Sequence, residues 1–176
     1  MLTRALLCLF LVTSVACSTP LETVRLPGVG PLWVVGDMQD FGKGKGTRAE
    51  YVPVGQPVGG WTRHIEIQFL EGSTLSPEEG MQAFRKQMVA TCPQVSWIIV
   101  DSDRRSITYE WRLEDCNARD DQHELVRILR GNDGLHLVSY GEMRARMDLI
   151  TRDLWLDRLE AAVVIKGDDQ DVVEVR

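Results

Sequence analysis

The sequence predicts an α+β fold: a single mostly antiparallel sheet packed by two helices. Three observations support this prediction. Alternating apolar and polar residues indicate strands on both sides of a capped helix, four strand segments follow that helix in a row, and an amphipathic helix comes last. The chain has 176 residues, of which 44% are hydrophobic, so one domain with one packed core is expected.

The region before the first helix is expected to hold three strands, over 32–38, 50–53 and 61–70. In the last of them, Ile65, Ile67 and Phe69 alternate with polar residues, which is the period of a half-buried strand. Between the first two strands, glycines alternate with Lys43 and Lys45 over 42–47. That spacing does not fit a phosphate-binding loop, so a basic hairpin loop is expected.

A helix is predicted over 77–91. Ser76 is suited to cap its first turn, Pro77 fits the first helical position, and Glu79 completes a capping box. Pro93 cannot continue a helix, so the element must end close to Cys92.

Four strands are then expected, over 95–100, 106–113, 124–130 and 135–140. Gly131-Asn132-Asp133-Gly134 is a strong hairpin signal between the last two. A final helix is expected over 142–163, because an apolar stripe recurs there at helical spacing. The stripe consists of Met143, Met147, Ile150 and Leu154, widened by Trp155.

Residues 1–16 are expected to be a cleaved signal peptide, because a basic start precedes an apolar run far shorter than the ~20 residues of a spanning helix. Ser14-Val15-Ala16-Cys17 resembles the lipobox of bacterial lipoproteins, in which the cysteine receives diacylglycerol, although the family pattern favours Leu at position 14. The resemblance implies a lipid anchor on Cys17, with the outer membrane as its destination and the periplasm as its surroundings. Secretion as a free or soluble periplasmic protein is the alternative.

The full-length chain is then expected to comprise four parts: a cleaved signal peptide over 1–16, an anchor and tether over 17–31, one α+β domain over 32–164 and an acidic tail over 165–176. Cys92 and Cys116 form an even pair in an oxidising compartment. A disulfide between them closes a loop of roughly 25 residues, which the chain-entropy model values at about 3 kcal/mol. Two buried free thiols are the alternative.

The order of elements over 32–164 is similar to that of the PsbP-like fold, which DcrB-type bacterial lipoproteins share. The resemblance implies a binding or assembly factor without catalysis, although a shared fold does not by itself transfer a function. A net charge of −6 argues against a nucleic acid as the partner.

Candidate site residues are few. The three histidines, His64, His123 and His136, are expected at the surface, and no catalytic, metal or cofactor site is predicted. Most large aromatic residues are expected in the core. Trp61 is the exception, because Gly59-Gly60 places it at a loop edge.

Taken together, the sequence predicts a lipid-anchored cell-envelope protein that binds a protein, a peptide or another envelope component without chemistry. The membrane is its partner through Cys17, and the expected contact residues are Trp61, Arg63, Lys43 and Lys45. The alternative is an envelope hydrolase with an unrecognised site around Asp121, His123 and Glu124. That alternative requires His123 to meet a carboxylate or a nucleophile in a pocket.

Overall fold

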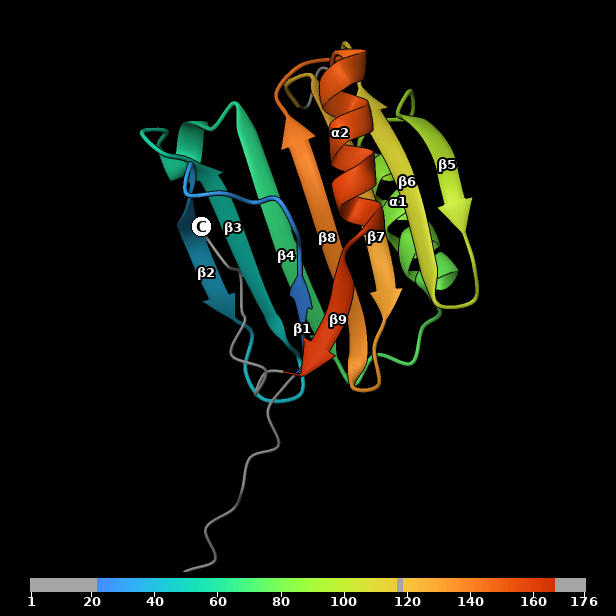
Figure 1. Cartoon of the computed structure of the whole chain (residues 1–176). Helices are drawn as coiled ribbons and strands as arrows, with labels where there is room; N and C mark the ends of the chain where they lie inside the picture. Colours follow the sequence, from blue (N-terminus) through green and yellow to red (C-terminus); the bar gives the residue numbers. More distant parts are fainter. Residues whose placement is uncertain (1–21, 117–118, 167–176) are drawn as a thin grey trace, which may run out of the picture.

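The computed structural model describes residues 22–116 and 119–166 and confirms the α+β fold (Figure 1). Its main sheet has the strand order β2-β3-β4-β8-β7-β6-β5, and every neighbouring pair is antiparallel. The seven strands are β2 (Trp33–Asp40), β3 (Thr47–Pro53), β4 (Arg63–Glu71), β5 (Ser96–Ser102), β6 (Ser106–Leu113), β7 (Gln122–Arg130) and β8 (Gly134–Glu142). A short 3-10 turn, η1 (Val58–Gly60), lies between β3 and β4.

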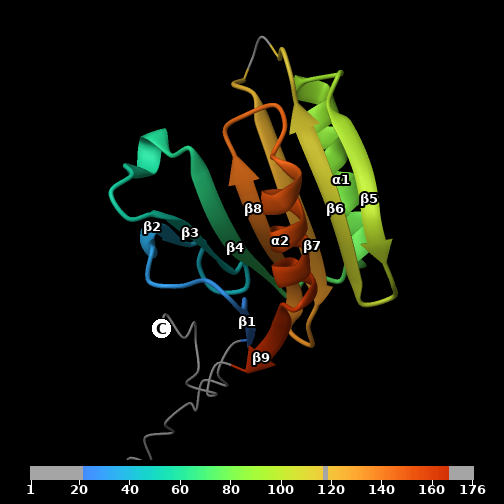
Figure 2. The same cartoon turned by 45° about the horizontal axis from the view of Figure 1, so that its top comes forward.

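The two helices, α1 (Pro77–Thr91) and α2 (Leu149–Glu160), cover opposite faces of this sheet (Figures 1 and 2). On β6, Ile107, Tyr109 and Trp111 belong to the apolar cluster under α1, whereas Leu125 of β7 belongs to the cluster under α2. The next residue of β7, Val126, belongs to the cluster under α1, so successive strand residues contribute to two cores, one on each face. Among the described residues, no helix is long and apolar enough to cross a membrane.

The start and the end of α1 follow the sequence signals. The Ser76 hydroxyl accepts a hydrogen bond from the Glu79 amide at 3.2 Å, and the Ser76 amide donates to Glu79 Oε2 at 2.7 Å. The predicted disulfide between Cys92 and Cys116 is confirmed. It joins the end of α1 to the segment between β6 and β7, so the helix is fixed to the edge of the sheet beneath it.

The ends of the described chain differ from the expectation. Glu22–Arg25 forms β1, within the segment expected to be a tether, and pairs with β9 (Val163–Lys166) in a separate two-stranded sheet. Val24 is buried in the core under α2. The folded region is therefore longer at both ends than the expected range 32–164.

The prediction for the last helix was wrong at its start. Strand β8 continues to Glu142, and α2 begins only after Asp148, whose Oδ1 accepts a hydrogen bond from the Thr151 amide at 2.9 Å. The expected apolar stripe is also only partly buried. Ile150 is 84% exposed and Leu154 46% exposed, because Trp155 and Leu159 are the residues that face the sheet.

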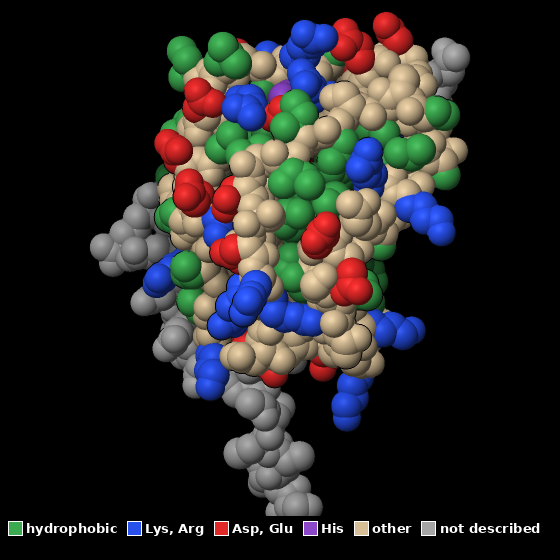
Figure 3. All heavy atoms as spheres, turned by 90° about the vertical axis from the view of Figure 1, so that its right-hand side faces the viewer, with side chains coloured by type: hydrophobic (Ala, Val, Ile, Leu, Met, Phe, Trp, Pro, Cys, Tyr) green, Lys and Arg blue, Asp and Glu red, His purple; other side chains and the backbone are tan. Residues whose placement is uncertain are grey.

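One edge of the sheet is apolar. Strand β5 exposes Ile98, Ile99 and Val100, and Figure 3 shows apolar side chains gathered in the middle of this side of the molecule, with charged side chains around them. The pairing register of β5 with β6 shifts between Ile99 and Asp101. Such a bulge distorts an edge strand and discourages it from pairing with a strand of another chain.

Candidate functional site

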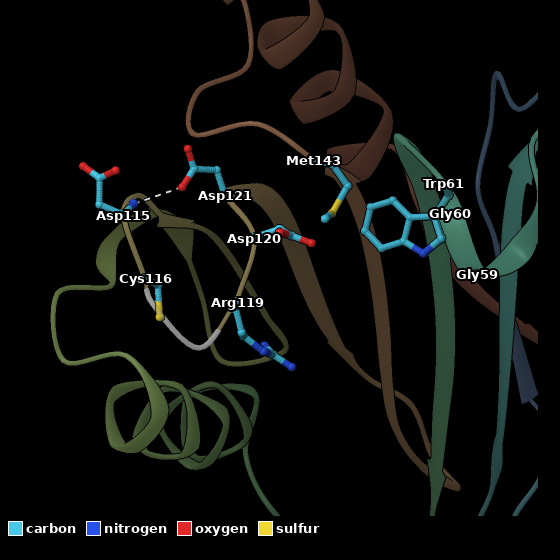
Figure 4. A pocket seen from close by; sticks show the side chains of 9 residues that line it. All are labelled: Gly59, Gly60, Trp61, Asp115, Cys116, Arg119, Asp120, Asp121 and Met143. Atoms are coloured by element: carbon cyan, nitrogen blue, oxygen red, sulfur yellow. Dashed lines mark hydrogen bonds between the residues drawn. The ribbon is translucent and has the colours of Figure 1, made fainter.

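A cleft of about 820 Å³ opens at the end of the sheet where β4 begins. Two segments that are distant in sequence form its walls: the turn before β4 and the connection between β6 and β7. The lining residues are Gly59, Gly60, Trp61, Asp115, Cys116, Arg119, Asp120, Asp121 and Met143 (Figure 4). Trp61, which the sequence singled out, therefore does lie at a cavity.

The charge in this cleft is mostly negative, because three aspartates line it beside one arginine. Figure 4 shows Arg119 and Asp120 directed toward the space that separates them from Trp61, whereas Asp115 points away. Asp121 shapes the loop, since its Oδ1 accepts a hydrogen bond from the Asp115 amide at 2.9 Å. The free carboxylate nearest to the aromatic wall is thus that of Asp120.

The wall itself is a stack of two rings. The indole of Trp61 lies on the imidazole of His64, with 3.8 Å between ring centroids and 8° between planes. His64 is only 6% exposed, so its expected position at the surface was wrong. A Cβ atom at Gly141 of β8 would collide with His64 Nε2, so the imidazole lies across β8 only because position 141 is glycine.

Two carboxylates face the buried imidazole. His64 Nδ1 lies 3.6 Å from Glu50 Oε1, and Nε2 lies 3.9 Å from Glu124 Oε2. Neither ring nitrogen has a hydrogen-bond partner among the described residues. Burial, helped by the positive charge of Arg48, lowers the pKa of His64 to about 4.

The pKa of Glu124 is shifted upward, opposite to that of His64. Burial raises its pKa to about 8, and this effect outweighs the lowering by its hydrogen bond with Ser139. At neutral pH the carboxyl group of Glu124 therefore holds a proton, while His64 is uncharged. Two polar groups without formal charge therefore lie behind the indole that lines the cleft.

A separate, smaller cavity of about 70 Å³ lies on the α1 face, with Glu124 in its lining. Its lining includes Glu66, Gln68, Phe84 and Tyr109. The Tyr109 hydroxyl is fully buried and has no hydrogen-bond partner among the described residues. The α1 face of the sheet thus has buried polar atoms without hydrogen-bond partners at His64 and at Tyr109, among the described residues.

The four expected contact residues do not form one site. Trp61 lines the cleft, but Arg63 begins β4 and lines a different pocket on the α2 face. Lys43 and Lys45 lie in the β2–β3 loop, where the Gly44 amide donates to Glu71 Oε2 at 2.7 Å. Since Glu71 is the last residue of β4, that loop lies roughly 26 Å from Arg63 at the usual rise of a strand.

The other two histidines are also buried, contrary to the sequence expectation. His123 Nδ1 accepts a hydrogen bond from the Met147 amide at 2.9 Å, and Nε2 lies 3.5 Å from Glu110 Oε2. His136 Nε2 lies 3.4 Å from Glu22 Oε2. Central strands covered on both faces leave no solvent face for these residues, which alternation alone could not reveal.

The residues of the hydrolase alternative are separated by the fold. Asp121 lines the cleft, His123 belongs to the α2 face, and Glu124 belongs to the α1 face. Consecutive residues of a strand point to opposite sides, so His123 and Glu124 cannot act on one substrate. His123 does meet a carboxylate, Glu110, but Arg152 also holds that carboxylate, with Nε 2.6 Å from Glu110 Oε2.

Within 22–116 and 119–166, no group of three His, Cys, Asp or Glu side chains is placed to hold a metal ion. A search of protein-family models finds no match to this chain, and a search of curated proteins finds none either. The geometry of the cleft is thus the basis for a functional proposal.

Proposed function

We propose that this protein is a lipid-anchored binding or assembly factor of the cell envelope, and that the cleft beside Trp61 holds a basic segment of a partner protein or peptide. One observation carries the proposal: the Trp61 indole forms one wall of a cleft, and the Asp120 carboxylate points into that cleft. A lysine or arginine side chain satisfies both features, because its charge pairs with carboxylates and also interacts with the face of an indole.

The construction of the wall favours such a partner. Trp61 is held by its stack on His64, so it needs little ordering when a ligand binds. Tryptophan in a partly desolvated pocket is the residue type that most often dominates the energy of an interface. Asp120 adds an attraction that depends on ionic strength.

The lipid anchor is a separate part of the proposal. It rests on the lipobox-like segment that ends at Cys17, outside the described residues. A protein held in this way faces the periplasm from the outer membrane, where a tethered domain can capture exported partners.

The anchor is tested by Cys17→Ser in the full-length chain. The variant should lose globomycin-sensitive processing and move from the membrane to the soluble fraction. Unchanged partitioning would contradict lipidation but would leave the cleft untouched as a binding site.

The cleft is tested by titrating the full-length protein, in a nonionic detergent, with a lysine-rich peptide and with a glutamate-rich peptide of equal length. The lysine peptide should bind more tightly, and Trp61→Ala and Asp120→Asn should each weaken it by roughly tenfold. Asp153→Asn, on the exposed side of α2, is the matched control and should bind like the unchanged protein. Equal binding of both peptides would overturn the assignment of a basic partner.

A further inference from the structure

We infer that a second pocket, on the α2 face of the sheet, binds a small organic acid with an apolar body. The pocket has a volume of about 400 Å³. That is within the range of natural small-molecule sites. Its lining includes Trp33, Arg63, Tyr140, Leu154, Trp155 and Arg158. The pocket lies on the face opposite the acidic cleft and does not depend on the function proposed above.

Three aromatic rings form the inner corner of this pocket. Tyr140 and Trp155 are stacked, with 4.0 Å between centroids and 8° between planes. Trp33 meets both edge-on, at 6.1 Å from Tyr140 and 5.8 Å from Trp155. These contacts fix the rings to one another, so they provide a preformed apolar surface for a ligand.

Two guanidinium groups lie at the same pocket. Arg158 Cζ is 4.6 Å from the centroid of the Trp155 ring. Gly28 makes this position accessible, because a Cβ atom there would come within 2.9 Å of Arg158 Nε. Arg63 reaches the pocket from the first position of β4.

The guanidinium N–H groups of both arginines have no partner among the described residues and can bind a ligand. Among the described residues, neither Arg63 nor Arg158 has a side-chain hydrogen bond or a carboxylate within 4.0 Å. Glu142 lies opposite Arg63 in the β4–β8 ladder, but its carboxylate has other partners. Its Oε1 accepts a hydrogen bond from the Tyr140 hydroxyl at 2.6 Å, and its Oε2 lies 3.1 Å from Arg144 Nε.

These features define the chemistry of the ligand. Guanidinium groups bind carboxylates with paired hydrogen bonds, so an acidic head is expected at Arg63 and Arg158. The apolar body of the ligand would lie against the three rings. Exposed Leu32 and Leu154, at 74% and 46%, extend this apolar surface to the rim of the pocket.

The probe is 3-phenylpropanoate, with its uncharged amide as the matched control ligand. Full-length protein carrying ¹⁵N-labelled tryptophan, in a nonionic detergent, reports binding through its indole N–H signals. The acid should shift the signals of Trp33 and Trp155 in a saturable way. Trp97 and Trp111 belong to the opposite core and should stay unchanged. The amide should bind at least roughly tenfold more weakly, because charge-assisted hydrogen bonds are lost.

Variants then assign the acidic head to the two arginines. Arg63→Gln and Arg158→Gln should each weaken the acid by roughly tenfold or more, whereas Arg85→Gln, on the exposed side of α1, should leave its affinity unchanged. Arg158→Lys keeps the charge over Trp155, so its affinity for the acid should lie between that of the unchanged protein and that of Arg158→Gln. This intermediate affinity distinguishes a lost guanidinium contact from damage to the helix. Equal affinity for acid and amide, a shift confined to Trp61, or no saturable shift up to about 10 mM would each overturn the inference.

Discussion

The two faces of the sheet use their buried histidines differently. On the α2 face, His123 and His136 each bond through one ring nitrogen to a segment far away in sequence, at Met147 and Glu22. On the α1 face, His64 is equally buried but has no hydrogen bond, and it lies between two carboxylates at 3.6 and 3.9 Å. The first two histidines join parts of the fold, whereas the third lies under a cleft.

This difference distinguishes buried histidines that stabilise the fold from one that lies next to a cleft. A buried polar group without partners costs free energy, so a fold retains it only where something else compensates. His64 is compensated in part by its stack on Trp61, which forms the cleft wall. His123 and His136 therefore contribute to stability through their bonds to distant segments, whereas His64 supports the indole that lines the cleft.

The largest expected effect is that of Glu22→Ala. Glu22 accepts hydrogen bonds from the Asn132 amide, the Asn132 side chain and the Asp133 amide, all within 3.0 Å, and it also faces His136. Losing a buried carboxylate with that many donors should lower the free energy of unfolding by about 3 kcal/mol. Urea denaturation of the full-length protein measures the change.

Two further variants show whether the faces differ. Glu160→Ala, on the exposed end of α2, should change stability by less than about 0.5 kcal/mol. His64→Leu should cost about 1 kcal/mol or less, because no hydrogen bond is lost and only the stack is sacrificed. If His64→Leu destabilises as strongly as Glu22→Ala, then His64 is structural as well, and the proposed contrast fails.

The next effect concerns the close approach of His64 to Gly141. Gly141→Ala should lower the free energy of unfolding by about 2 kcal/mol, because its Cβ would displace the buried imidazole. In a His64→Ala background the same substitution should cost much less, with a coupling of at least about 1 kcal/mol. Gly59→Ala, where a Cβ meets nothing within 4 Å, is the control. Additive costs would mean that the ring does not lie against β8.

The sequence was sufficient for most elements of the fold. Long segments with a clear period, such as 61–70 and 77–91, formed the predicted strand and helix. Strands β1 and β9 were missed because four residues are too few to display a period, and their pairing joins the two ends of the described chain. The overlong last helix arose because Met143 and Met147 fit helical spacing, although Asp148 and Thr151 carried a usable cap signal.

The site was less predictable than the fold. Trp61 was identified because two glycines mark a loop edge, but His64 was expected at the surface, and Glu124 was named only in the hydrolase alternative. Alternation shows which residues share a face and not whether another layer covers that face. A glycine in a strand often marks a close approach by another group, but Gly141 lay just beyond the expected strand 135–140, so this signal was missed. The glycine alone could not identify His64 as the approaching residue, because Gly141 and His64 become neighbours only through the pairing of β4 with β8.

The smallest effect tests the protonation of Glu124 on the α1 face. Its folded pKa of about 8 exceeds the ordinary value of 4.5, so the folded state holds a proton that the unfolded chain releases. Its contribution is therefore fully present below about pH 4.5 and is lost as the pH rises through about 8. His64 and His123, with pKa values lowered to about 4, act oppositely, adding stability as the pH rises from about 4 to 6.5.

The histidines titrate in the unchanged protein and in Glu124→Gln alike, so the difference between the two proteins reports Glu124. Between about pH 6.5 and 7.5 the unchanged protein should lose about 1 kcal/mol relative to Glu124→Gln, which cannot ionise. Urea midpoints across this range measure the difference, and Glu78→Gln, at the exposed start of α1, should keep the slope of the unchanged protein. Parallel slopes for Glu124→Gln and the unchanged protein would mean that Glu124 is ionised beside His64. A negative charge would then lie next to the imidazole that supports Trp61, and the attraction for a basic partner would not depend on Asp120 alone.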